Sequence, residues 1–391
     1  MTRLLTRLLG RLPIGWLQLV HNKTRLAAAV AGVAFANLLV FVQLGILGAM
    51  NGSIVASYDL FQPDIMLSAA DSNTLTDGSN IARSRMFQAL GVPGVADGTP
   101  LFIGNMEWAR GEGDVAMLQT FAMDVAAGGF VRPKIGTQFN ALQLEDAMLI
   151  DRFTRGLPEG ALDSVSPDAP FIFEASGRTM RAVGTLEIGG SFAADGTVFV
   201  SDQTFMRLFA NRTLGAPNHI LLKVQDGVSV DTVIERLKQV LPTNDVQIRS
   251  FADAKADDLS FQTTEKPTGI IFGFGVLIGV LVGIVIVYQI LSTDVADHLK
   301  EYATFKAMGY SQAFFTGIVF EEAIVLAVFG FIPGLLASMA FYAGLVAATG
   351  LPVEMDANRA LTVFVGTVVA CAISGTIATR RLAGADPADL F

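Results

Sequence analysis

The chain has 391 residues, of which 52% are hydrophobic and only 16% are charged, and its formal net charge is −9. Soluble proteins carry about 25% charged residues, so this composition excludes an ordinary soluble protein and indicates a membrane protein. The predicted fold class is an α-helical integral membrane protein with four transmembrane helices, plus an α+β extracytoplasmic domain between the first and second helices. No nucleic-acid partner is expected.

Residues 1–25 predict a basic amphipathic helix on the cytoplasmic side. Arg3, Arg7 and Arg11 recur among leucines, and Trp16 follows them. This pattern is typical of a helix that lies on the inner leaflet and contacts membrane lipid. A docking surface for a partner protein is the alternative interpretation.

Four stretches are long and apolar enough to cross a bilayer, at residues 26–50, 268–291, 313–348 and 360–379. The first stretch reaches roughly 37 Å at a rise of 1.5 Å per residue, against a hydrocarbon core of ~30 Å. The third stretch is too long for one straight span, and Gly330, Pro333 and Gly334 offer a bend.

Basic residues near the span ends predict the orientation. Residues 1–25 carry basic residues and no acidic ones, and the tail at 380–391 begins with Arg380 and Arg381. Because cytoplasmic flanks are enriched in Lys and Arg, both termini are predicted to be cytoplasmic. Residues 349–359 then form a short periplasmic connection. The first apolar run is longer than a signal peptide's and no clear Ala-x-Ala site follows it, which favours an uncleaved anchor.

Residues 51–267 have the composition of a soluble domain, with 27 acidic and 17 basic residues and therefore a net charge of −10. We predict a periplasmic α+β domain of two subdomains, large enough to bury its own core. The single cysteine, Cys371, lies in the fourth span, so this domain has no disulfide. Ser176-Gly177-Arg178 is a plausible hairpin turn. Strands are expected at 64–68, 101–104, 147–151, 171–174, 181–186, 197–200 and 220–224, and helices at 81–90, 202–209 and 230–241.

Residues 292–312 join the second and third spans and predict an amphipathic helix over 291–309. An apolar residue recurs every three or four positions, which makes one apolar stripe, and Gly309 is placed to end the helix. The stripe consists of Leu291, Val295, Leu299, Tyr302, Phe305 and Met308. Transmission of force requires a stiff element docked on one face, so this segment is predicted to couple the spans to a cytoplasmic partner. The predicted coupling residues are Asp294, Asp297, His298, Lys300, Glu301, Lys306 and Gly309.

Small residues recur at four-residue spacing in three spans, which permits close packing of helix backbones in lipid. They predict a tight bundle that includes a dimer seam, although glycine and alanine are also simply common in membrane helices. The predicted packing residues are Gly275, Gly279, Gly283, Gly330, Gly334, Gly366, Ala370 and Ser374.

Two adjacent acidic residues, Glu321 and Glu322, lie some nine residues into the third span. A carboxylate in hydrocarbon is costly unless it is paired, protonated or hydrated, so both are functional candidates. The alternative is that the third helix begins below the bilayer and that both side chains lie at the headgroup level.

Motifs of catalysis are missing from the sequence. It has three histidines and no Gly-x-Ser-x-Gly, His-Glu-x-x-His or Walker motif. No catalytic residue, metal ligand or cofactor is therefore predicted, and the chain is not expected to be an enzyme. The spans carry only isolated polar residues such as Asn37, Gln43 and Gln289, which argues against a solute pathway through them.

The order of these elements resembles the MacB/FtsX permease superfamily, and several segments are similar to the DevC-type permease of the heterocyst glycolipid exporter. The most specific segment runs from Tyr288-Gln289-Ile290-Leu291-Ser292-Thr293-Asp294-Val295 to Tyr302-Ala303-Thr304-Phe305-Lys306-Ala307-Met308-Gly309-Tyr310. Further similar segments are Val183-Gly184-Thr185, Ser191-Phe192-Ala193-Ala194-Asp195-Gly196-Thr197, Ser201-Asp202-Gln203-Thr204-Phe205, and the tail with Arg380-Arg381 and Asp386-Pro387-Ala388-Asp389.

The resemblance implies a permease subunit of an ABC exporter, with ATP bound by a separate cytoplasmic ATPase that contacts the coupling helix. It also implies a location in a bacterial inner membrane, a homodimer of permeases, a periplasmic membrane-fusion adaptor and a TolC-like outer-membrane channel. The substrate by analogy is a glycolipid or another amphiphile. The alternative is an FtsX-like regulatory membrane protein that switches a cell-wall hydrolase and transports nothing.

Overall fold

The computed structural model describes residues 13–110, 114–158, 160–189, 191, 194–349, 351 and 353–383. The predicted basic segment up to residue 12 and the tail from 384 onward lie outside these residues. The described chain divides into two compact units. We call them the helical unit (residues to Leu47, Ile270–Ala348, and from Val353) and the sheet unit (Gly48–Gly269, with Thr349 and Leu351).

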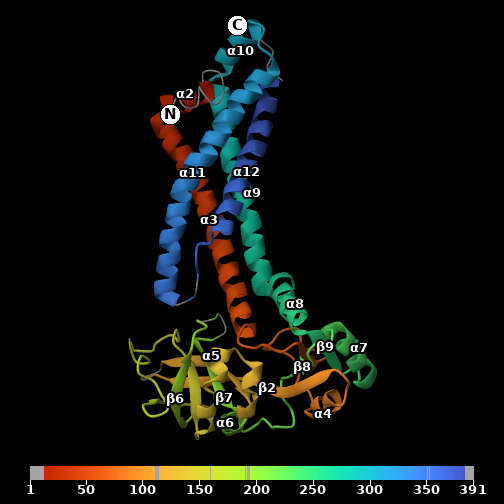
Figure 1. Ribbon diagram of the computed structural model, residues 1–391. Coiled ribbons are helices and arrows are strands. Elements are labelled where there is room, and N and C mark those ends of the chain that lie inside the picture. The colour runs from red at the N-terminus through yellow and green to blue at the C-terminus, as the bar shows by residue number, and fades with distance from the viewer. Residues whose placement is uncertain are drawn as a thin grey trace. The chain divides into compact units, whose positions relative to one another are not determined.

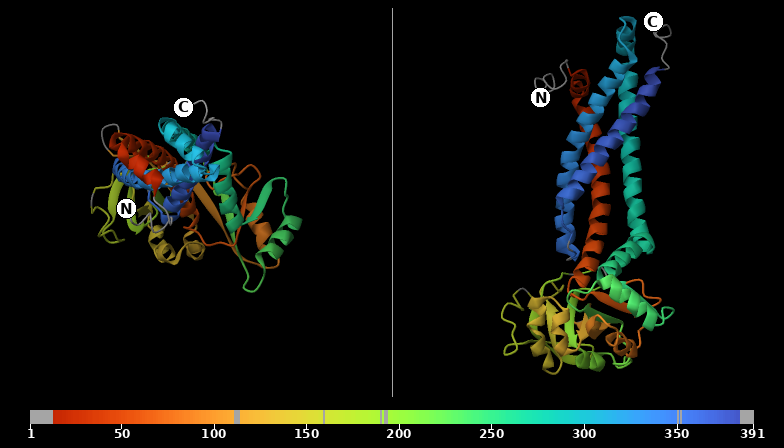
Figure 2. Two further views of the ribbon diagram at one scale, coloured as in Figure 1. Left: turned by 90° about the horizontal axis from the view of Figure 1, so that it is seen from above. Right: turned by 45° about the vertical axis from the view of Figure 1, so that its right-hand side comes forward.

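The helical unit is built from long helices that lie side by side (Figures 1 and 2). In the described part of the chain, four helices are long and apolar enough to cross a membrane. The two short helices, α2 and α10, lie at the end of the bundle where α12 finishes (Figure 1). The helices are α2 (Ile14–His21), α3 (Lys23–Tyr58), α9 (Pro267–Asp297), α10 (Leu299–Ala307), α11 (Gln312–Thr349) and α12 (Ala357–Ala383).

Each long helix extends beyond the apolar run that predicted it. Helix α3 continues to Tyr58 and α9 to Asp297, because polar residues can prolong a helix once it has left the lipid. Helix α11 is continuous through Pro333, the position where a bend was expected. Neighbouring helices make proline tolerable at such a position in a membrane.

In the described residues of the sheet unit, nine strands form a sheet in the order β3-β7-β4-β6-β5-β2-β8-β1-β9, and an additional β2–β3 pairing closes six of them into a ring. The strands are β1 (Ile65–Ala69), β2 (Val95–Ala109), β3 (Val115–Met123), β4 (Ala147–Asp151), β5 (Phe171–Ala175), β6 (Arg178–Leu186), β7 (Gly196–Ser201), β8 (His219–Val224) and β9 (Val246–Ser250). The four-stranded part β2-β8-β1-β9 shares only β2 with the ring.

The long strand β2 changes partner along its length. Its first half, as far as Leu101, pairs with β8, and its second half, from Phe102, pairs with β3. Helices α4 and α7 pack on the four-stranded part and bury residues such as Met86 and Leu237 against it. The helices of this unit are α4 (Ser84–Leu90), η1 (Val125–Phe130), α5 (Pro133–Gly136), η2 (Phe139–Gln143), α6 (Asp202–Leu208), α7 (Val230–Val240) and α8 (Phe251–Thr264).

The expected turn and all seven expected strands are present, and two further strands were missed. Ser176 and Gly177 both have positive φ, at 49° and 72°, in the turn that joins the antiparallel strands β5 and β6. The sequence analysis did not predict β3 or β9. Strand β3 contains two alanines, a residue type that is depleted in strands.

Candidate functional site

The segment predicted as one coupling helix is two helices in the structure. Helix α9 runs on to Asp297, and α10 begins at Leu299 after a break at His298. The prediction of a single helix over 291–309 was therefore wrong. Met308, expected in the buried stripe, is 60% exposed, and it lies one residue beyond α10, which ends at Ala307. Leu291, Val295 and Tyr302 are buried as expected.

Gly309 lies where it can close α10. Its φ is +92°, a backbone conformation that favours glycine. The N–H of Gly309 donates to the carbonyl of Lys306 at 3.0 Å, and the N–H of Tyr310 donates to that of Phe305 at 3.2 Å. These bonds satisfy carbonyls at the end of the helix in the manner of a glycine C-cap.

The polar residues around the break differ in exposure. The side chains of Asp297 and Glu301 are 58% and 60% exposed, and His298 Nδ1 lies 3.2 Å from a carboxylate oxygen of Glu301. Lys306 is half-buried, and the side chain of Lys300 lies outside what the structure describes. The exposed side chains belong to the surface that a partner protein could contact.

Asp294 is buried, contrary to its predicted place on the polar face. It is only 3% exposed and forms an ion pair with Arg25 of α3, at 3.4 Å from the guanidinium. A second guanidinium nitrogen of Arg25 lies 2.5 Å from Asp297. Arg25 thus ties the start of α3 to the end of α9, a contact that no sequence pattern had indicated.

Glu321 and Glu322 lie in the protein interior at the α10 end of the bundle. Glu321 is 6% exposed and accepts a hydrogen bond from the backbone N–H of Trp16 at 3.2 Å, and Glu322 is fully buried. Helix α2 covers both carboxyls. A Cβ placed on Gly15 would lie 2.9 Å from Glu322 Cγ, so only glycine permits this close approach. The signal missed in the sequence was Gly15 beside Trp16 in the amphipathic segment.

The glycines of α9 and α11 pack against α3. A Cβ on Gly279 would lie 2.9 Å from Val40, and one on Gly283 would lie 3.2 Å from Ala36. Similarly, Gly275 approaches Gln43, Gly330 approaches Val33, and Gly334 approaches Ala34 and Asn37. The glycine stripes of α9 and α11 therefore pack against α3 of the same chain. On α12, Ser374 donates a hydrogen bond to the carbonyl of Ile284 in α9 at 2.9 Å.

We expect Gly330→Ala to lower the free energy of unfolding by about 1–3 kcal/mol, because overpacking a close contact strains both partners. The added Cβ would lie 2.5 Å from Val33 Cβ. Gly366→Ala is the matched control, since no described atom lies within 4 Å of the Cβ it would add. Thermal unfolding of both variants in detergent tests this expectation, and equal melting temperatures would contradict it.

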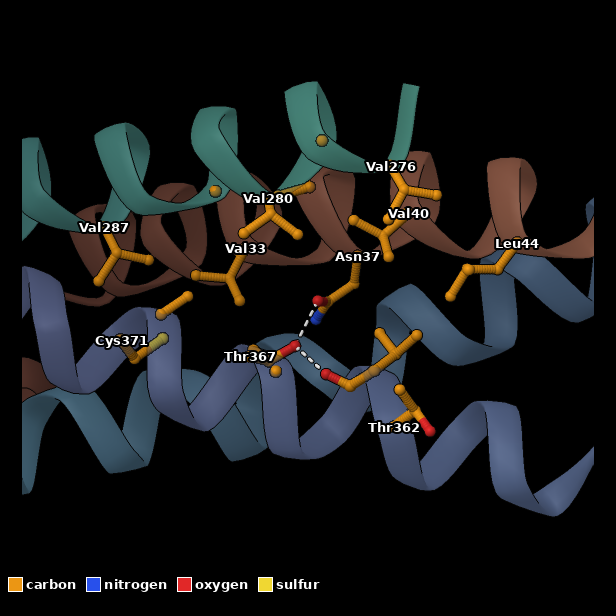
Figure 3. A pocket seen from close by; sticks show the side chains of 16 residues that line it. Val33, Asn37, Val40, Leu44, Val276, Val280, Val287, Thr362, Thr367 and Cys371 are labelled. Atoms are coloured by element: carbon orange, nitrogen blue, oxygen red, sulfur yellow. Dashed lines mark hydrogen bonds between the residues drawn. The ribbon is translucent and has the colours of Figure 1, made fainter. Parts of the chain in front are cut away.

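A cavity of about 220 Å³ lies between α3, α9 and α12 (Figure 3). Valine side chains such as Val33, Val280 and Val287 point into it, and Gly366 and Ala370 also line it. Its polar feature is the pair of Asn37 and Thr367, whose Oγ1 donates to Asn37 Oδ1 at 2.6 Å. Gly366 and Ala370, which were predicted to pack directly against a helix, line this cavity instead.

The sheet unit buries polar groups that hold loops in place. Asp258 accepts hydrogen bonds from the Tyr58 hydroxyl at 3.1 Å and from the Leu75 N–H at 2.8 Å, and burial raises its pKa. His219 Nε2 lies 2.9 Å from the Leu75 carbonyl, and Nδ1 lies 2.9 Å from Ser68 Oγ. Among the described residues, no group of three or more His, Cys, Asp or Glu could hold a metal.

The stability of the sheet unit is expected to fall in acid because of His219. Burial lowers the pKa of His219 to about 4 from its ordinary 6.5. The neutral imidazole is therefore favoured in the folded state, and its contribution is lost as the pH falls from 6.5 through 4. The shift corresponds to about 3 kcal/mol. Trp108, which is buried in this unit, provides a fluorescence signal for unfolding of the intact chain once Trp16 is replaced by Phe.

A His219→Gln variant is the matched comparison for this pH dependence. Burial raises the pKa of Asp151, Asp202 and Asp258, and these groups favour the folded state as the pH falls, which opposes the effect of His219. The difference between the two pH profiles therefore isolates the histidine. Parallel profiles between pH 6.5 and 4 would contradict the assignment.

Comparison with known proteins finds a similarity for the C-terminal part of the chain. Residues 269–387 match the family described as FtsX-like permease C-terminal, so this part of the chain is similar to that family. A comparison with curated proteins gives no match.

Two solved structures are similar to part of the chain. The extracellular domain of the noncanonic ABC-type transporter YknZ from Gram-positive bacteria is 11% identical, with a TM-score of 0.34, and the match covers 48% of this chain and 98% of that one. The periplasmic region of MacB from Actinobacillus actinomycetemcomitans is 12% identical, with a TM-score of 0.32, and the match covers 51% of this chain and 93% of that one. With values this low, neither likeness bears on function.

Proposed function

We propose that this chain is the permease subunit of an ABC exporter, which transmits the ATP-driven motion of a separate cytoplasmic ATPase to the sheet unit. The observation that carries the proposal is helix α10, whose apolar side is buried while Glu301 on its other side is 60% exposed at the side chain. The match of residues 269–387 to FtsX-like permeases supports it.

The contacts of α10 with α11 and α2 support a role in transmitting the motion of the ATPase to the bundle. The ring of Tyr302 lies 5.6 Å from that of Phe315 in α11, and its hydroxyl donates to Gln18 of α2 at 3.3 Å. The centroid of the Phe305 ring lies 6.3 Å from that of the Phe314 ring in α11. Because buried aromatic contacts of this kind resist sliding, displacement of α10 is expected to move α11 and α2 with it.

A second permease copy is part of the proposal, and the outer face of α9 supports it. Large apolar side chains on this helix are exposed within the chain, including Ile271 at 65% and Val285 at 59%. Either lipid or a second copy can cover such a face. The glycines of α9 already contact α3, so we expect a dimer to use the bulky residues of α9 and not its glycine stripe.

The substrate and the remaining partners are proposed by analogy with the resembling family. They are a glycolipid or another amphiphile as substrate, a periplasmic membrane-fusion adaptor and a TolC-like channel. The acidic composition of residues 51–267, with a net charge of −10, is consistent with an exported domain in an inner-membrane protein whose termini are cytoplasmic.

Purification of the tagged permease from detergent, with mass spectrometry of its partners and an ATPase assay, tests the proposal. We expect a Walker-motif ATPase together with a periplasmic adaptor. An ATPase with a cell-wall hydrolase and no adaptor would instead support the FtsX-like regulatory alternative. Recovery of the folded permease with no ATPase would overturn both.

A further inference from the structure

A buried amide group in the cavity between α3, α9 and α12 has a donor without an acceptor. Asn37 of α3 is 5% exposed and lines this cavity, where its side chain points towards Thr367 of α12 (Figure 3). Its Oδ1 accepts a hydrogen bond from the Thr367 hydroxyl, but its Nδ2 has no acceptor among the described residues. Because a buried donor without an acceptor is costly and therefore rare, this amide N–H is available to a ligand.

The rest of the described lining is mainly apolar and offers little to water. Its two threonine hydroxyls, those of Thr362 and Thr367, each lie within 2.8 Å of a backbone carbonyl of α12. Valines supply much of the remaining surface. Since a buried water requires two to four polar partners, one free amide N–H among valines favours an apolar ligand with a single acceptor over a cluster of water molecules.

The cavity lies at the depth where a bilayer contains only hydrocarbon. Asn37 is near the middle of the apolar stretch 26–50, and Thr367 is near the middle of the stretch 360–379. Headgroups are separated from this depth by roughly 15 Å, half of the ~30 Å hydrocarbon core. An acceptor for Asn37 Nδ2 is therefore carried on the apolar part of a ligand and not on its headgroup.

The cavity opens between α9 and α12 and has room for part of a hydrocarbon chain. Val33 on α3 is buried, whereas Val280 on α9 and Gly366 on α12 are exposed. The volume of about 220 Å³ exceeds the roughly 150 Å³ of a cavity that binds benzene. It is smaller than the ~300–1,000 Å³ of sites that enclose a whole drug-sized ligand, so a segment of a chain fits and a whole lipid does not.

We propose that this cavity binds a segment of the hydrocarbon chain of a membrane amphiphile, at a point where the chain carries a carbonyl oxygen. The oxygen accepts a hydrogen bond from Asn37 Nδ2, and the neighbouring carbons lie against the valines of α3 and α9. A plain hydrocarbon chain leaves the amide N–H without an acceptor, so the cavity selects for the oxygen. This inference rests on the contacts of the helical unit and not on the proposed function.

Native mass spectrometry of the intact chain in detergent tests this inference, with methyl stearate and methyl 12-oxostearate as the probes. The two probes have the same chain and ester and differ only in the carbonyl oxygen at mid-chain. We expect the wild-type protein to bind the oxo probe about 2- to 10-fold more tightly, the gain in affinity from one net hydrogen bond. Asn37→Leu has a side chain of similar size without an N–H and should bind both probes equally.

Gly366→Leu is the second variant, in case Asn37→Leu does not fold. Its side chain fills the opening of the cavity, so it should bind neither probe. Gly344→Leu is the matched control, because it adds the same side chain to an exposed glycine of α11 that does not line the cavity, and it should bind as the wild-type protein does. The inference is overturned if the wild-type protein binds the two probes equally or binds neither. It is equally overturned if a folded Asn37→Leu or Gly366→Leu variant, identified by its cooperative thermal unfolding, keeps the preference for the oxo probe.

Discussion

Replacing Arg25 with leucine is expected to lower the free energy of unfolding of the helical unit by about 3–5 kcal/mol, the usual cost of removing one partner of a buried ion pair. Arg25 lies between Asp294 and Asp297, and Asp294 is 3% exposed. Without the guanidinium, Asp294 has no other ion-pair partner among the described residues. Chemical unfolding of the full chain in detergent measures the loss.

The control for this prediction is Arg132→Leu. Arg132 forms an ion pair with Asp59 at 3.2 Å in the sheet unit, but its side chain is 56% exposed, so its loss should cost about 1 kcal/mol or less. A second substitution, Asp294→Asn, should recover part of the stability lost in Arg25→Leu. Equal losses in the two arginine variants, or no recovery in the double variant, would show that burial of the ion pair does not stabilise the unit.

Substitutions in α10 are expected to uncouple ATP hydrolysis from export. Glu301→Lys reverses an exposed charge on α10, and Gly309→Leu places a branched side chain at a φ of +92°. We expect both variants to insert and to keep ATP hydrolysis, while export falls by roughly 5- to 150-fold, the range of a coupling free energy of about 1–3 kcal/mol. Substrate export and ATPase activity of the reconstituted complex are the two measurements.

Glu235→Lys is the control for these coupling variants. It makes the same charge change on an exposed residue of α7 in the sheet unit, and it should leave both measurements unchanged. Normal export by Glu301→Lys and Gly309→Leu would remove α10 from the coupling mechanism. Loss of ATP hydrolysis together with export would point to failed assembly with the ATPase.

The sequence predicted the four long helices because hydropathy reports directly on the lipid that surrounds them. It did not predict where those helices end, since a helix continues as hydrogen-bonded backbone after its side chains become polar. The break at His298 is an example. The residues on either side of the break can all join a helix. Packing against α2, α3 and α11 determines which side chains of α10 face the bundle.

The contacts that define the candidate site depend on pairs of residues that are far apart in the chain. Arg25 and Asp297 are separated by 272 positions, and no local pattern in a single sequence relates them. Glu321 and Glu322 could be recognised as unusual because a charge in an apolar run is costly. Their partners could not be recognised, because α2 covers them from the opposite end of the sequence.

Strand β2 determines how the sheet unit can come apart. Its fifteen residues belong to the six-stranded ring and to the four-stranded part, and the change of partner falls between Leu101 and Phe102. Neither part can lose strand β2 without removing hydrogen-bond partners from the other. One buried cluster also joins Met66 and Leu221 of the four-stranded part to Phe121 and Phe199 of the ring. Amide hydrogens in both parts should therefore exchange with solvent in one cooperative opening, at a single free energy.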